Sequence, residues 1–108
     1  MAKLETVMSC NFEPLVARIE KGILDGSISA SLEDKSDFIG KTSRCSVRVF
    51  ERFSYTGSNR VSMNITFFQE NGGPIYISAI TSGGSQGIFN KINTFGENAF
   101  LDKLKEIL

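Results

Sequence analysis

The sequence predicts an α+β fold, with two helices packed on one face of a single antiparallel sheet. Segments in the middle of the chain alternate apolar and polar residues, which is typical of strands with one buried and one wet face. A segment near each end instead carries apolar residues at helical spacing, so each presents one apolar stripe. Two such helices and a one-sided sheet are most simply assembled with both helices on the dry face.

Length and composition indicate one domain, residues 1–108. The 12 basic residues balance 12 acidic ones, so the chain as a whole has no electrostatic attraction to nucleic acid. The sequence contains no histidine, which removes His-based catalytic triads and most zinc sites. We therefore expect no catalytic residue, no metal site and no cofactor.

The start of the chain, the length of its apolar runs and its cysteines predict the cellular compartment. The chain begins without an apolar leader, and no apolar run approaches the roughly 18 residues of a membrane span. Cys10 and Cys45 lack the spacing of a metal site or a disulfide framework, so we interpret them as packing residues. These observations predict a cytoplasmic protein that has no membrane partner.

The first third of the chain predicts a strand and a helix. Residues 3–9 alternate weakly and form the first predicted strand. Asn11 should cap the helix, which would end at Gly22 or Gly26. The predicted buried stripe of this helix is Phe12, Leu15, Val16, Ile19 and Ile23.

Four further strands are predicted in the middle of the chain. They cover residues 27–34, 43–55, 60–69 and 75–81, with a loop at 35–42. The residues predicted to face the core are Ile28, Ala30 and Leu32 in the first, Cys45, Val47, Val49, Phe53 and Tyr55 in the second, and Val61, Met63, Ile65 and Phe67 in the third.

The loop between the second and third of these strands follows from their pairing. Both predicted core sets have odd numbers, and directly opposite residues share a face, so paired numbers should have an even sum. A three-residue loop at 57–59 satisfies this rule. It would pair Phe53 with Met63 and Val49 with Phe67.

In the last quarter of the chain the sequence does not decide the type of one element, which is either a strand or a helix. Gly83, Gly84 and Ser85 form either a hairpin loop before a strand at 87–95, or the start of a helix whose amides bind an anion. Thr94–Glu97 has the spacing of a capping box. The C-terminal helix should then bury Phe100, Leu101, Leu104, Ile107 and Leu108. The predicted order is β-α-β-β-β-β-(β)-α.

One row of basic residues is a candidate surface site. Arg44, Arg48 and Arg52 share one face of a strand, predicted to be the wet face, with Arg60 beyond the turn. Such a row could follow phosphate groups. A solvated row that pairs with nearby carboxylates is the alternative that the zero net charge favours. Phe68 adds exposed apolar area beside it, which makes self-association as plausible as RNA binding.

A candidate ligand pocket lies between the sheet and the last helix. Val49, Met63, Phe67 and Phe100 would line it. Glu51 interrupts the apolar pattern there, and a buried carboxylate has its ionised form disfavoured. Glu51 would act as a base or ligand contact in the cavity, or else reach water at the margin of the sheet.

Three segments carry a resemblance to a known family. They are FERFSYTG, ITSGGSQG and INTFGENAFLDKL. They resemble the characteristic segments of a family of small uncharacterised bacterial proteins, a domain of unknown function. The resemblance covers nearly the whole chain and implies a cytoplasmic bacterial protein with no known activity. The order of elements is also similar to helix-grip and TATA-binding-protein-like folds, in which a curved sheet wraps a C-terminal helix.

Two functional hypotheses follow. The first is a non-enzymatic module, which either binds a small apolar ligand beneath the last helix or forms a homodimer through its sheet. The second is a phosphate or nucleic-acid binder that uses the arginine row and the loop at Gly83–Ser85. Nucleic acid is the less favoured partner because the net charge is zero.

Overall fold

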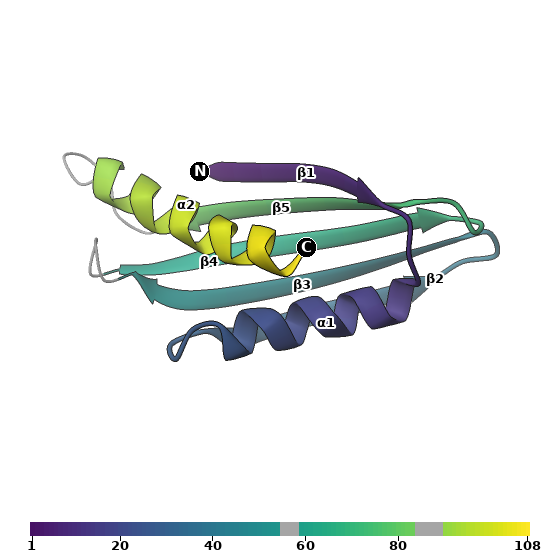
Figure 1. Cartoon of the computed structure of the whole chain (residues 1–108), viewed down its shortest axis with the longest axis horizontal. Helices are drawn as coiled ribbons and strands as arrows, with labels where there is room; N and C mark the ends of the chain where they lie inside the picture. The colour runs from purple at the N-terminus through teal and green to yellow at the C-terminus, as the bar shows by residue number, and fades with distance from the viewer. Residues whose placement is uncertain (55–58, 84–89) are drawn as a thin grey trace.

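The computed structural model describes residues 1–54, 59–83 and 90–108, with side chains for all of these except 54, 59 and 90–96. Within these ranges the order of elements is β-α-β-β-β-β-α (Figure 1). Their bounds are β1 Ala2–Met8, α1 Phe12–Asp25, β2 Ser31–Ile39, β3 Ser43–Ser54, β4 Asn59–Glu70, β5 Ile75–Gly83 and α2 Asn90–Ile107.

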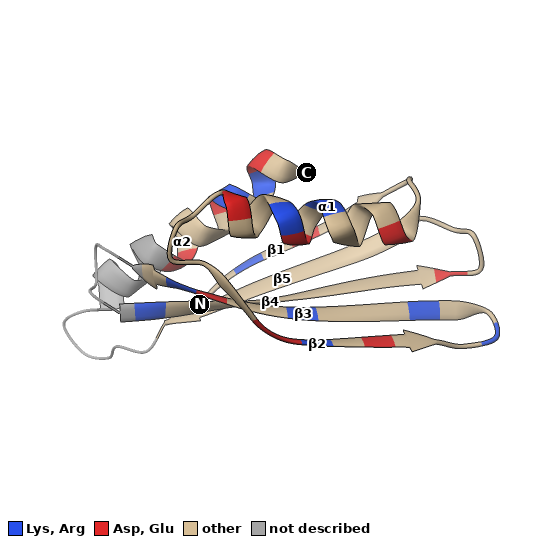
Figure 2. Cartoon of the chain, turned by 90° about the horizontal axis from the view of Figure 1, so that it is seen from below, with Lys and Arg blue, Asp and Glu red and all other residues tan. Residues whose placement is uncertain are grey.

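The strands form one antiparallel sheet in the order β1-β5-β4-β3-β2. Both helices lie on the same side of this sheet, and its other face is left uncovered (Figures 1 and 2). The predicted α+β class, with two helices on one face of a single antiparallel sheet, is therefore confirmed.

The apolar stripes of both helices form the core with β4 and β5. Every residue predicted for the stripe of α1 is buried, because the spacing of these side chains places them on one side of the helix. Asn11 occupies the N-cap position, although its side chain makes no capping hydrogen bond, and the helix ends at Asp25 before Gly26. From α2 the core takes Phe100, Leu101 and Leu104, also as predicted.

The turn between β4 and β5 is formed by Asn71 and Gly72. Asn71 and Gly72 have φ of 28° and 75°, and the Gly73 N–H donates to the Glu70 carbonyl over 2.7 Å. Two successive residues at positive φ match the right-handed twist of the paired strands. This turn fixes the register of β5 against β4.

Two element boundaries were predicted wrongly. The strand placed at 27–34 is β2, Ser31–Ile39, which takes in most of the predicted loop and leaves Ile28 fully exposed. Ala30 and Leu32 pack against the core as predicted, so only Ile28 of the three predicted core residues is placed wrongly. The optional strand at 87–95 is also wrong, because α2 begins at Asn90 and so includes the supposed capping box. Residues 84–89 lie outside the described part of the chain.

The face assignment of β3 was inverted. The structure pairs Phe50 with Met63 and Arg48 with Ile65, so even-numbered residues of β3 face the helices. Ser54 pairs with Asn59, so the predicted three-residue loop is wrong; residues 55–58, which separate the strands, are outside the described chain. The even-numbered residues can face the helices because the arginines among them contact aromatic and acidic side chains there, which a hydrophobic pattern does not register.

Candidate functional site

The arginine row of β3 lies beneath the helices rather than on the wet face. Arg48 is only 6% exposed. Its Nε contacts Glu20 Oε1 on α1 at 2.5 Å, and its Nη2 contacts Asp37 Oδ1 on β2 at 3.0 Å. Nη1 also donates to the Ser36 carbonyl on β2 over 3.2 Å. Arg48 therefore joins α1 to the edge strand and does not offer its charge to a phosphate.

Asp37 is held by a second donor besides Arg48. The Ser46 hydroxyl donates to Asp37 Oδ1 over 2.6 Å. This hydrogen bond is the main cause that holds the pKa of Asp37 below its ordinary value of 3.8. Arg48 lowers the pKa of Asp37 further, while partial desolvation acts in the opposite direction. The carboxylate is thus kept ionised as a structural partner.

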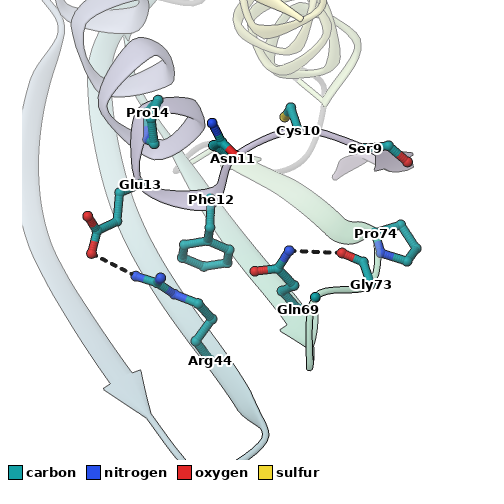
Figure 3. A pocket seen from close by; sticks show the side chains of 11 residues that line it. Ser9, Cys10, Asn11, Phe12, Glu13, Pro14, Arg44, Gln69, Gly73 and Pro74 are labelled. Carbon is teal, nitrogen blue, oxygen red and sulfur yellow. Dashed lines mark hydrogen bonds and ion pairs between the residues drawn. The ribbon is translucent and has the colours of Figure 1, made fainter.

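Arg44 contacts the N-terminal end of α1. Its guanidinium stacks 4.2 Å above the ring of Phe12, and Nη2 contacts Glu13 Oε1 at 3.1 Å (Figure 3). Its Nε is buried and has no hydrogen-bond partner within the described chain. These contacts lie beside an open pocket of about 750 Å³ between the start of α1 and the β4–β5 turn. The Glu13 carboxylate already neutralises Arg44, so an anion gains little from entering.

The other two arginines of the candidate surface site, Arg52 and Arg60, also have partners. Arg52 lies 5.0 Å above the ring of Phe100 on α2, and burial lowers the pKa of its guanidinium. Arg60 lies on the uncovered face of the sheet, where its Nε donates to Glu51 Oε1 over 2.8 Å and this bond raises the pKa of Arg60. The prediction that the row from Arg44 to Arg52 is solvent-exposed is therefore wrong.

The predicted apolar pocket is not assembled. Met63, Phe67 and Phe100 are fully buried in the core on the helix-covered side. Val49 and Glu51 lie on the opposite face of the sheet, because β3 is turned over relative to the prediction. Glu51 is half-buried beside Arg60, so it reaches water instead of entering a cavity.

The predicted anion-binding loop lies only partly within the described residues. Gly83 ends β5, while Gly84 and Ser85 fall outside the described residues, and with them the anion-binding loop. Among the described residues, no three His, Cys, Asp or Glu side chains gather as metal ligands. Within that same part of the chain, no helix is long and apolar enough to cross a bilayer.

The uncovered face carries an apolar row that crosses the whole sheet. Strand pairing aligns these residues directly opposite one another, from β1 to β2. Phe38 is 66% exposed, Val7 and Tyr76 are 52% each, and Phe68 is 38%. Cys45, in the same row, is half-buried. We call Val7, Tyr76, Phe68, Cys45 and Phe38 the apolar row.

A second row of different character runs parallel to it. Four residues along each strand, the register aligns Lys3, Ile80, Asn64, Val49 and Asp34. This charged row has a cation on edge strand β1 and an anion on edge strand β2. The residues between the two rows are Glu5, Ser78, Thr66, Val47 and Ser36, and a groove of about 280 Å³ lies beside Phe68 and Tyr76.

Sequence reasoning singled out only part of this surface. Phe68 was identified as exposed apolar area, but Val7, Tyr76 and Phe38 were not. Each stands at an outward position of its strand, where a single apolar residue is common and carries no signal. The row becomes visible only when all four strand registers are known.

Comparison with protein-family models identifies the family of the chain. A family model matches residues 1–108, the full sequence. The chain belongs to DUF6054, a family of unknown function. This confirms the resemblance drawn from the three sequence segments, whereas the bacterial origin it implied stays a prediction. Neither the curated proteins nor the solved structures contain a match to the chain.

Membership of DUF6054 assigns no role to any residue. The geometry described above is therefore the basis for a function. In this DUF6054 chain the charged side chains beneath the helices hold the layers together, and the uncovered face carries the apolar row.

Proposed function

We propose that this protein is a non-enzymatic self-association module, in which two copies meet through the uncovered face of the sheet. The apolar row carries the proposal. An antiparallel sheet that faces water normally shows polar side chains on that face. Here five residues from five strands form one continuous apolar strip.

The size of the face fits a pair of copies. Five strands about 4.8 Å apart and nine residues long give a face of roughly 700 Å². A standard interface buries about 800 Å² on each partner. Two sheets that pack face to face enclose an apolar layer, as in a β-sandwich.

Association through the edge strand β2 is disfavoured. Glu33, Asp34, Lys35 and Asp37 lie close together along the outer strand β2, and the register shifts between Leu32 and Asp34. Charges and a bulge on an edge strand prevent another strand from adding to it. The face is thus the better surface for a second copy.

A small apolar ligand is the second candidate. The groove beside Phe68 and Tyr76, about 280 Å³, favours it because it is lined partly by exposed apolar side chains. The arginine-based binding hypothesis is disfavoured, because Arg44, Arg48 and Arg52 lie on the helix-covered side and already contact Phe12, Glu20 and Phe100.

Sedimentation velocity over a range of protein concentrations tests the proposal. The native chain should sediment as a dimer at micromolar concentration. Phe68→Arg places a guanidinium in the centre of the apolar row and should weaken dimerisation at least thirtyfold, as expected for a central interface residue. Ile28→Arg is the matched control, because Ile28 is fully exposed in a loop away from this face.

The proposal fails if the native chain is a monomer at all accessible concentrations. It also fails if Phe68→Arg and Ile28→Arg change the dimer dissociation constant equally. If an apolar small molecule co-purifies with a monomer and is displaced by Phe68→Arg, the ligand hypothesis replaces it.

A further inference from the structure

We infer that the two copies are related by a two-fold axis that runs along β4, so that Lys3 of one copy faces Asp34 of the other. This inference rests on the proposed self-association and goes further, because it fixes how the copies are oriented and which residues select the partner. It follows from the order of the strands and from the two rows on the uncovered face.

An axis parallel to β4 between the two sheets exchanges the two halves of the face. The sheet order is β1-β5-β4-β3-β2, with β4 in the middle. Rotation therefore places β1 over β2 of the second copy, β5 over β3, and β4 over itself. Each row of one copy then lies over the same row of the other.

The apolar row matches itself under this operation. Val7 faces Phe38 of the second copy, and Tyr76 faces Cys45. Phe68 lies on the axis and faces its own counterpart. All five members of the row are thus covered by apolar or weakly polar atoms, and none meets a charge.

The charged row also matches itself, and here the match is electrostatic. Ile80 faces Val49, and Asn64 faces itself on the axis. Lys3 faces Asp34, and the symmetry makes this ion pair twice. A single chain thus carries a cation, Lys3, and an anion, Asp34, at equal distances from β4, each two strands away from it.

An axis perpendicular to the strands fits less well. If it ran midway between the rows, it would place the apolar row over the charged row, with Phe38 against Asp34 and Val7 against Lys3. If it ran along the apolar row, only a short part of the face would overlap, because β4 ends two residues beyond Phe68. Neither arrangement brings Lys3 to Asp34.

Lys3 and Asp34 are both available for such a contact. The side chain of Lys3 is exposed, and its Nζ lies 3.6 Å from Glu5 Oε1 on the same strand. Asp34 is exposed, and its Oδ1 accepts the adjacent backbone N–H of Lys35. Stacked sheets are rotated by about 30°, and the flexible stem of lysine spans the resulting offset at the edge strand.

Two complementary charge reversals test this arrangement. In Lys3→Glu, each of the two ion pairs becomes a contact between carboxylates, and in Asp34→Lys each becomes a contact between ammonium groups. Either variant alone should dimerise about tenfold more weakly than the native chain. In a mixture of the two variants, the heterodimer regains attraction at both contacts.

Native mass spectrometry of the mixture, with one variant isotopically labelled, measures the proportions of the dimers. We expect the heterodimer in clear excess over the statistical proportion. A mixture of Lys41→Glu and Asp102→Lys is the matched control, because it carries the same charge changes on exposed residues of the β2–β3 loop and α2, and it should mix statistically.

Statistical mixing of the Lys3→Glu and Asp34→Lys variants overturns the inferred orientation. The proposed function is tested separately by Phe68→Arg. A dimer that is sensitive to Phe68→Arg but mixes statistically would leave self-association standing and reject the axis along β4. A native chain that stays monomeric would reject both.

Discussion

At the scale of single residues, Arg48 connects three elements of the fold. Its side chain is almost fully buried, yet it contacts a carboxylate on α1, another on β2, and a carbonyl of β2. A buried charge is tolerated when it is paired and its hydrogen-bonding groups are satisfied. Asp37 is the more exposed of its two acidic partners, and its pKa is lowered.

The lowered pKa of Asp37 makes its contribution to stability depend on pH. A carboxyl whose pKa is lower in the folded state stabilises the fold above its unfolded pKa, and this is lost as the pH falls through the folded value. The Asp37→Asn variant lacks this contribution. We therefore expect the difference in unfolding free energy between the native chain and Asp37→Asn to be largest near pH 6 and to shrink below pH 3.8.

Urea unfolding at a fixed protein concentration, repeated across this pH range, measures the difference. Ser46→Ala removes the strongest cause of the lowered pKa, so in that background the difference should be smaller at pH 6 and should disappear at a higher pH. A difference that stays constant from pH 6 to pH 3 would show that Asp37 does not act through its ionised form.

At the scale of elements, the two helices touch where α1 has a glycine. A methyl group on Gly22 would lie 2.6 Å from Cδ1 of Ile107 on α2. Glycine in the middle of a helix costs about 1 kcal/mol relative to alanine. The close contact with Ile107 explains why an alanine is not simply better there.

A double-mutant cycle tests this explanation. Gly22→Ala in the native background should give no gain or a loss of stability, because Ile107 must move. In the Ile107→Ala background the same change should stabilise the chain by about 1 kcal/mol. Urea unfolding of the four chains measures the coupling, and equal effects in both backgrounds would contradict the close contact.

The two helices and the strands β1, β4 and β5 could be predicted, because the apolar pattern of each indicates a single buried face. The stripe of α1 from Phe12 to Ile23 and the alternation in β4 each bury all their apolar members. In β3 both faces carry apolar residues, so the alternation does not choose between them. The choice is made by Arg44, Arg48 and Arg52, whose partners Phe12, Glu20 and Phe100 come from distant segments.

One sequence signal could have indicated the right face of β3. Glu13 and Glu20 are seven residues apart on α1, about 10 Å along a helix. Arg44 and Arg48 are four residues apart, about 13 Å along a strand. Acids on a helix and bases on a strand at similar spacing indicate that the helix lies over that face of the strand.

At the scale of the whole molecule, the fold has two layers and therefore one uncovered face. The two faces of β3 are the reverse of those predicted from the sequence, so the predicted surface site lies under the helices and part of the predicted core lies on the open face. In the structure Arg44, Arg48 and Arg52 lie on the helix-covered face. Cys45, Val47 and Val49 lie on the open face. The apolar row depends on four registers at once, so it could not be assembled from a single strand pattern.

Chemical cross-linking measures most directly whether two copies meet with β4 on the axis. In a background that carries Cys10→Ser and Cys45→Ser, Phe68→Cys provides one thiol per chain, next to its own symmetry mate. Opposite residues of stacked sheets are about 10 Å apart, too far for a disulfide but within reach of a short bis-maleimide.

Phe38→Cys on the same face is the control, because Phe38 faces Val7 of the second copy and the two Phe38 residues of the dimer lie at opposite edges of the interface. We predict that Phe68→Cys gives a covalent dimer in high yield and that Phe38→Cys gives little. Equal cross-linking of the two variants, or none at Phe68→Cys, would contradict an interface centred on β4.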